Sequence, residues 1–211
     1  MIYLYCERIG PGVSAEPFNA LSNVAFLIAA WAAWSLARRT QTLAAGIWVL
    51  IALSIVIATG SALFHTYATA WARILDEVPI LLFQLWYLWL YMRLVMAQRP
   101  EIVATSIIGY MAAAILGRQF PLVLNGSLVY APALVLMLGL GLYHFLQRKA
   151  GRCLLLAATG VFLISLALRS IDEAVCSWVP TGTHFLWHIL TGAVLYLSMR
   201  ALILNRPGRT G

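Results

Sequence analysis

The chain has 211 residues, of which 63% are hydrophobic and only 10% are charged. Soluble domains usually have about a quarter of their residues charged, so this composition excludes a water-soluble globular protein and indicates an integral membrane protein. The net charge of +7 does not indicate a nucleic-acid binder, because the basic residues fall in loops and at the ends of hydrophobic stretches, where they act as topology signals.

Seven hydrophobic stretches reach the length of about 20 residues that a helix needs to cross a bilayer core about 30 Å thick. They predict a single all-α domain over 1–211, an integral membrane bundle of seven transmembrane helices. The spans are expected near 18–37, 43–65, 76–96, 101–117, 121–146, 152–171 and 183–204.

The basic residues are distributed unequally between the two sides that these spans define. One side has Arg8, Arg73, Arg118 and Arg169, and the other has Arg38, Arg39, Arg93, Arg99, Arg148, Lys149, Arg152, Arg200, Arg206 and Arg209. The positive-inside rule therefore places the C-terminus in the cytoplasm and the N-terminus outside.

The acidic residues fall almost entirely on the outer side, where they are Glu7, Glu16, Asp76, Glu77, Asp172 and Glu173. Either a cation site on the outer face or a mere lack of Lys in the outer loops would explain this. Cys6 and Cys176 also fall outside, and an oxidising compartment would permit a disulfide between them.

Three histidines are expected on the same outer side. His184 and His188 lie one turn apart on one face of the last span, and that pair alone could equally be hydrogen-bonded into helix packing. His65 ends the second span at a similar depth, whereas His144 is at the inner end of the fifth. Three ligands with an open fourth position are typical of a catalytic zinc site.

Two further groups are expected beside the histidines. Ser61 lies one turn below His65, and its hydroxyl either faces the same cavity or bonds the carbonyl four residues earlier. Asp76 is expected to open the third helix as its N-cap, and we favour an added role in proton transfer. Asp172 is expected to pair with Arg169 at the outer rim or to support the site from behind its ligands.

Four separated stretches of the chain resemble the alkaline ceramidase family, and the chain looks like a bacterial-type member. The family belongs to a superfamily of seven-helix membrane hydrolases that includes the adiponectin and progestin receptors. The stretches are Cys6-Glu7 with residues 15–23 (AEPFNALSN), Ser61-x-x-x-His65 with Asp76-Glu77, Ile171-Asp172-x-x-x-Cys176, and residues 184–192 (HFLWHILTG).

The resemblance implies that His65, His184 and His188 hold zinc, which activates water to cleave the amide bond of ceramide or a related N-acyl lipid. Ser61 would stabilise the oxyanion and Asp76 would handle the proton. Animal members also hold calcium near the N-terminus. Here Leu4-Tyr5 stands where they have Asp-Trp, and the calcium ligands would be Glu7, Glu16 and Asn19.

Other functions stay open at this point. The chain could be a lipid-binding receptor or sensor with a structural zinc site, or a zinc hydrolase acting on another lipid bond. Head groups could contact outer residues that otherwise serve as interfacial anchors, namely Tyr67, Trp71, Arg73, Arg118, Gln119 and Asn125. The composition is that expected of a protein in a bacterial cytoplasmic membrane. On the predicted topology the site lies toward the outer face, and a membrane lipid would be the partner.

Overall fold

The fold is seen in a computed structural model that describes residues 1–206, so that residues 207–211, with Arg209, lie outside the described part. Every regular element within residues 1–206 is helical. Seven stretches are long and apolar enough to span a membrane, namely Pro17–Arg39, Ala45–Tyr67, Ala70–Leu94, Pro100–Arg118, Ser127–Leu146, Leu154–Ile171 and His184–Leu204. The predicted seven-helix membrane bundle is confirmed.

The first span consists of two helices separated at Asn23, α1 (Pro17–Ser22) and α2 (Val24–Arg39). The other long helices are α3 (Ala45–Tyr67), α4 (Ala70–Leu94), α5 (Pro100–Arg118), α6 (Ala131–Leu146), α7 (Leu154–Ile171) and α8 (His184–Leu204). Two short 3₁₀ helices complete the set, η1 (Ser127–Tyr130) before α6 and η2 (Glu173–Val175) after α7.

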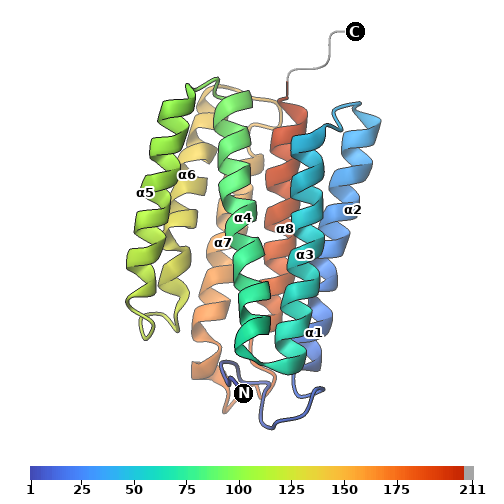
Figure 1. The fold of residues 1–211 in the computed structure, drawn as a ribbon, viewed down its shortest axis with the longest axis vertical. Helices are drawn as coiled ribbons and strands as arrows, with labels where there is room; N and C mark the ends of the chain where they lie inside the picture. The colour runs from blue at the N-terminus through green and yellow to red at the C-terminus, as the bar shows by residue number, and fades with distance from the viewer. Residues whose placement is uncertain (207–211) are drawn as a thin grey trace.

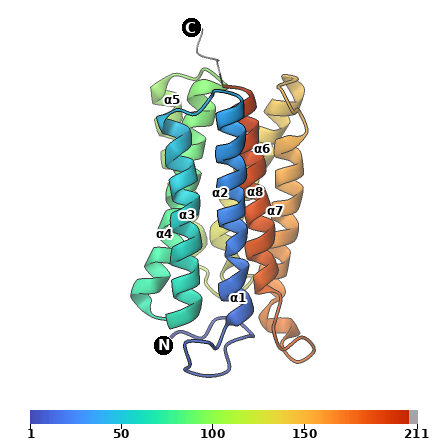
Figure 2. The ribbon, with the colours of Figure 1, turned by 90° about the vertical axis from the view of Figure 1, so that its right-hand side faces the viewer.

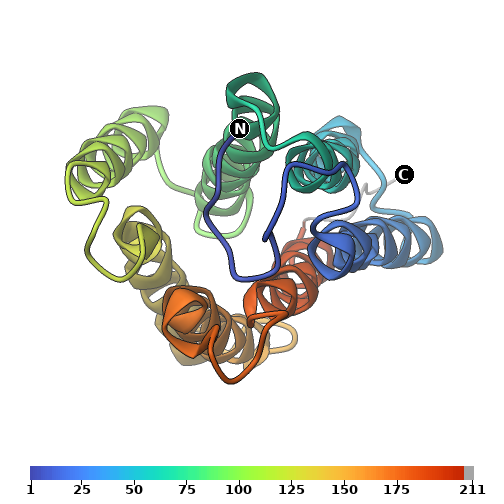
Figure 3. The ribbon, with the colours of Figure 1, turned by 90° about the horizontal axis from the view of Figure 1, so that it is seen from below.

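The long helices stand side by side (Figures 1 and 2). Seen from the end that holds the N-terminus, they form a ring in the order α4, α3, α2, α8, α7, α6, α5, and residues 1–16 cross that end of the ring (Figure 3). Helix α8 is the most enclosed, with 61% of its apolar window buried, against 11% for α5. The N-terminal segment and α8 are therefore the parts best placed to build an interior site.

Two predicted helix starts differ from the structure by six residues, and the others by one or two. Helix α4 begins at Ala70 rather than at 76, so Asp76 lies inside the helix and the N-cap prediction is wrong. The reason is that Ala68 adopts a left-handed conformation with φ of 47°, which reverses the chain at once after α3. The fifth span begins at Ser127 rather than at 121, because Leu124, Asn125 and Gly126 form a left-handed turn.

Glycines allow the helices around the N-terminal end to approach closely. A Cβ atom added to Gly60 of α3 would lie only 2.0 Å from the carbonyl oxygen of Leu75 in α4. One added to Gly192 of α8 would lie 3.0 Å from the backbone carbonyl carbon of Ala25 in α2. Small residues at such crossings let backbones pack against each other, as in other membrane helix pairs.

We predict that Gly60→Ala lowers the stability of the bundle by about 1–3 kcal/mol or more, because overpacking forces α3 and α4 apart. Gly109→Ala is the matched control, since a Cβ atom at Gly109 meets nothing within 4 Å. Thermal unfolding of both variants in detergent micelles checks this. Equal melting temperatures for the two variants would contradict the close approach of α3 and α4.

Candidate metal centre

Three buried histidines meet at the N-terminal end of the bundle. His65 is in the last turn of α3, and His184 and His188 are in the first two turns of α8. Their exposed fractions are 1%, 2% and 2%, and each offers one ring nitrogen within 4.8 Å of the others. The structure thus brings together the three histidines of the sequence prediction. His144 lies elsewhere, bonded to the hydroxyl of Tyr91 at 2.7 Å.

The orientation of His65 is set by Glu16, at the end of the N-terminal segment. The Nδ1 of His65 lies 2.5 Å from Oε2 of Glu16. Burial raises the pKa of Glu16, but hydrogen bonds from His65, Arg8 and Asn19 outweigh this and hold the pKa below its usual value. Because the carboxylate can only accept, Nδ1 carries the proton and Nε2 presents a lone pair.

His188 is oriented by the hydroxyl of Ser22, which closes α1. Ser22 Oγ donates its single proton to the carbonyl oxygen of Asn19 at 2.9 Å. Its contact with Nδ1 of His188 at 2.7 Å must then be a hydrogen bond that Oγ accepts. His188 therefore also carries its proton on Nδ1, and Nε2 is left as the basic nitrogen.

His184 is fixed from two sides. The ring of Tyr5 stacks on it with a centroid separation of 3.5 Å, and burial raises the pKa of Tyr5, so the phenol stays neutral. Asp172 accepts the backbone N–H groups of Thr183 and His184 at 2.6 and 2.8 Å, and so caps the start of α8. A carboxylate at a helix N-terminus is favoured by the exposed amides and by the helix dipole.

The predicted pair between Arg169 and Asp172 is wrong, because no ion pair joins them within residues 1–206. Asp172 is fully buried, and among the residues described its carboxylate accepts hydrogen bonds only from backbone amides, including that of Cys6 at 3.0 Å. Arg169 instead donates to the carbonyl of Asn125 and to the hydroxyl of Ser127. The carboxylate thus supports His184 through the helix start.

Ser61 lies one turn below His65 in α3 and is 2% exposed. Asp76 in α4 is close enough for its side chain to interact with both Ser61 and His65. The contact between α3 and α4 at Gly60 is what brings the two side chains together. A hydroxyl donor and a carboxyl group therefore lie beside the three histidines.

This donor set fits zinc. Within the described chain, Nε2 of His65 and Nδ1 of His184 are buried without a hydrogen-bond partner, which is costly unless a ligand is present. His65 and His188 have the second-sphere partners that metal-bound histidines usually have. Three imidazoles with space for a fourth ligand are typical of catalytic zinc.

Comparison with protein families places the whole chain. A family model described as Ceramidase matches residues 5–210. The chain belongs to the ceramidase family. Membership implies a hydrolase that acts on lipid amides, and the matched range extends over all seven spans. Comparison with curated proteins found no match.

The calcium site implied by the resemblance does not fit this ceramidase family member. The carboxylate of Glu7 accepts the backbone N–H groups of Phe18 and Asn19 at 2.6 and 2.8 Å, and Glu16 binds His65 and Arg8. Among the described residues, the one unpartnered side-chain oxygen of the predicted ligand set is Oδ1 of Asn19. Calcium needs six to eight oxygen ligands.

The cation beside Glu16 is the guanidinium of Arg8. Arg8 is 4% exposed and its Nε donates to Glu16 Oε1. Its Nη2 donates to the carbonyl oxygens of His65 and Thr66 at 2.7 and 3.4 Å, and its Nη1 to that of Gly12 at 3.3 Å. Arg8 therefore fastens the N-terminal segment to the end of α3.

The segment is also attached covalently. Cys6 and Cys176 form a disulfide, with their Cα atoms 5.2 Å apart, while Cys153 is free and exposed. The bond joins residues separated by 170 positions and so restricts the unfolded chain strongly.

Sequence reasoning missed three supporting residues, namely Tyr5, Arg8 and Ser22. Ser22 is within a stretch that carries the family resemblance, but a serine has no pattern that marks it as a histidine partner. Arg8 gave no usable signal either, because basic residues outside the spans are ordinary topology signals and its burial is a tertiary property.

We predict that calcium or a calcium chelator leaves the melting temperature of the purified protein unchanged. Arg8→Met should lower the stability by about 3–5 kcal/mol, because it leaves the buried Glu16 carboxylate without its cation. Arg39→Met, at an exposed arginine, is the matched control. A calcium-dependent rise in the melting temperature of the unaltered protein would contradict the assignment of Arg8 as the resident cation.

Proposed function

We propose that this protein is a zinc-dependent intramembrane hydrolase that cleaves the amide bond of ceramide or a related N-acyl lipid. The observation that carries the proposal is the buried triad of His65, His184 and His188. Hydrogen bonds to groups outside the triad orient the rings of His65 and His188. Two buried ring nitrogens of the triad, on His65 and His184, have no hydrogen-bond partner among the described residues. Membership of the ceramidase family supports the choice of an amide bond.

The three histidines would hold the zinc, which when bound acts as a Lewis acid that activates water and polarises the amide carbonyl. Glu16 and Ser22 keep two of the rings in the tautomer that a metal ligand needs. Asp172 holds the first turn of α8, and with it His184, in place.

Ser61 and Asp76 would act on the substrate. The Ser61 hydroxyl donates a hydrogen bond to the carbonyl oxygen as negative charge develops on it. Asp76 accepts a proton from the attacking water and returns it to the leaving nitrogen, so that the C–N bond breaks to give a carboxylic acid and an amine. Both side chains are on helices, which makes their positions rigid.

The active site would face the outer side of a bacterial cytoplasmic membrane. The excess of basic residues at the opposite end of the bundle supports this orientation. The disulfide between Cys6 and Cys176 supports it as well, because disulfides persist in oxidising compartments.

We expect the purified protein to contain about one zinc ion per chain, and His188→Ala to lose it, because two histidines bind zinc far more weakly than three. Elemental analysis of the protein, without any assay of activity, checks this. His144→Ala is the control and should keep its zinc. Full zinc occupancy in His188→Ala would exclude the three-histidine site.

Asp76→Asn should retain zinc but hydrolyse an N-acyl lipid about 10²- to 10⁴-fold more slowly, the usual loss when a general acid–base is removed. The comparison is Glu173→Gln, an exposed acid at the same end of the bundle. Release of fatty acid and zinc content are measured on the same preparations. Unchanged turnover in Asp76→Asn would remove the proton-transfer role.

A further inference from the structure

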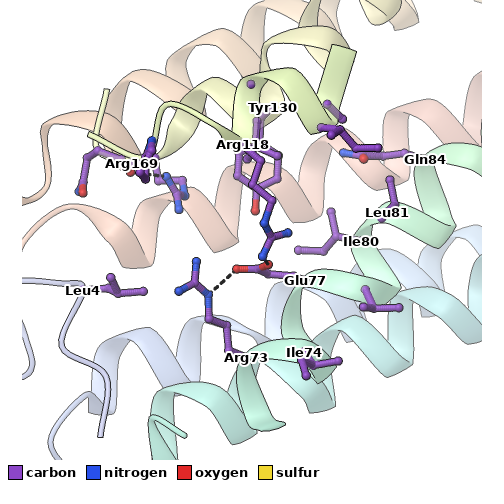
Figure 4. Close-up of a pocket in the computed structure, with 18 of the residues that line it drawn as sticks. Leu4, Arg73, Ile74, Glu77, Ile80, Leu81, Gln84, Arg118, Tyr130 and Arg169 are labelled. Atoms are coloured by element: carbon purple, nitrogen blue, oxygen red, sulfur yellow. Dashed lines mark hydrogen bonds and ion pairs between the residues drawn. The ribbon is translucent and has the colours of Figure 1, made fainter. Parts of the chain in front are cut away.

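A cavity of about 380 Å³ lies beside the metal centre, between the N-terminal segment, α4, α5, η1 and α7 (Figure 4). Tyr5 connects the two places, because its ring lines the cavity and also stacks on His184. Much of the lining is apolar and includes Leu4, Leu81 and Met111. A molecule in this cavity would therefore lie next to the histidines.

The charged groups of the cavity are mostly arginines. Arg73, Arg118 and Arg169 line it, against a single lining carboxylate, Glu77. Glu77 is already used twice, since it accepts from Arg73 at 2.6 Å and from Arg118 at 2.8 Å (Figure 4). Even with Asp76, which interacts with Arg169 electrostatically, the arginines outnumber the acids.

Arg169 is held by direct contacts with neutral groups. Its Nη1 donates to Asn125 O at 3.0 Å and to Ser127 Oγ at 2.7 Å, and its guanidinium lies over the rings of Tyr130 and Trp187 at 5.3 and 5.8 Å. Throughout residues 1–206, no carboxylate pairs with it. These contacts fix the guanidinium, whose five N–H donors exceed the two hydrogen bonds made to Asn125 and Ser127.

Interfacial anchoring accounts for Arg73 and Arg118, whose side chains are 42% and 63% exposed. It does not account for Arg169, which packs against Trp187, a side chain only 4% exposed. An arginine held by aromatic rings and neutral oxygens in a cavity suits an anion, which it can bind through two parallel hydrogen bonds. The hydroxyl groups of a neutral lipid would leave the excess positive charge of the cavity unbalanced.

We propose that the lipid cleaved at the metal centre carries an anionic oxygen group, a phosphate or a carboxylate, on the head-group side of its amide. This inference rests on the proposed function and narrows its substrate class. Arg169 binds the anionic group beside Tyr5, and the ion-paired Arg73, Glu77 and Arg118 form the charged rim of the cavity. The neighbouring apolar lining receives the start of the acyl chain.

The test compares three lipids with the same acyl chain, namely ceramide, ceramide phosphate and an N-acyl amino acid lipid with a free carboxylate. Binding is measured in nanodiscs of neutral lipid with the His188→Ala variant, which keeps both Asp76 and Arg169, and hydrolysis is measured with the unaltered protein. We expect an anionic lipid to bind about tenfold or more tightly than ceramide, as charged hydrogen bonds imply. The tighter of the two anionic lipids identifies the anion.

Two variants assign the preference to the cavity. Arg169→Gln should abolish the preference for anionic lipids. Arg118→Gln removes a more exposed charge from the same cavity and should reduce this preference, and it serves as the second variant in case Arg169→Gln does not fold. Arg93→Gln, an exposed arginine at the other end of α4, should keep it. Equal binding of all three lipids, or a preference that survives in both Arg169→Gln and Arg118→Gln, would overturn the inference.

The outcomes separate this inference from the proposed function. If ceramide is bound as tightly and hydrolysed as fast as the anionic lipids, the amidase function stands and the preference for an anionic substrate is excluded. If an anionic lipid binds through Arg169 but no lipid amide is cleaved, head-group recognition stands and the amidase function fails.

Discussion

The buried carboxylate of Glu16 is the interaction on which the rest of this end of the molecule depends. It accepts hydrogen bonds from Arg8, from His65 and from the side chain of Asn19. One anion thus connects the N-terminal segment, the end of α3 and the first turn of α1. A buried charge is stable only with its partners in place. The histidine ligand His65 and the cation Arg8 are therefore held in place by the same buried carboxylate. The protein uses its own guanidinium where the resemblance implied a metal ion.

A second buried carboxylate, that of Asp172, connects chain segments on the other side of the site. It is fully buried, and within the described part of the chain its carboxylate accepts hydrogen bonds only from the backbone amides of Cys6, Thr183 and His184. Gly182, with φ of 63°, leaves no room for a side chain, since a Cβ atom would lie 2.1 Å from Oδ1 of Asp172. The loop before α8 is thereby drawn onto the carboxylate, and the disulfide closes the same region covalently.

The sequence predicted the number of spans and the meeting of the three histidines at one end of the bundle, because hydrophobic length and helical spacing are local properties. It did not predict that Asp76 lies inside α4, since the start of that helix depends on a left-handed turn at Ala68. It also paired Arg169 with Asp172 because they are neighbours in sequence, whereas each side chain finds partners far along the chain. The roles of Tyr5 and Ser22 depend on tertiary contacts between the N-terminal region and α8, which no local pattern contains.

The helices differ in how much of their surface is buried, and this affects how a molecule could pass from the bilayer to the interior of the bundle. Helices α3 and α8, which carry the histidines, are half or more buried, whereas α5 is 11% buried. Displacing α5 outward would break the hydrogen bond between Tyr110 and Gln84 and the ion pair between Arg118 and Glu77. It would not move the helices that hold the histidines. Under the proposed function, the wall formed by α5 is therefore the side past which a lipid would reach the cavity from the bilayer.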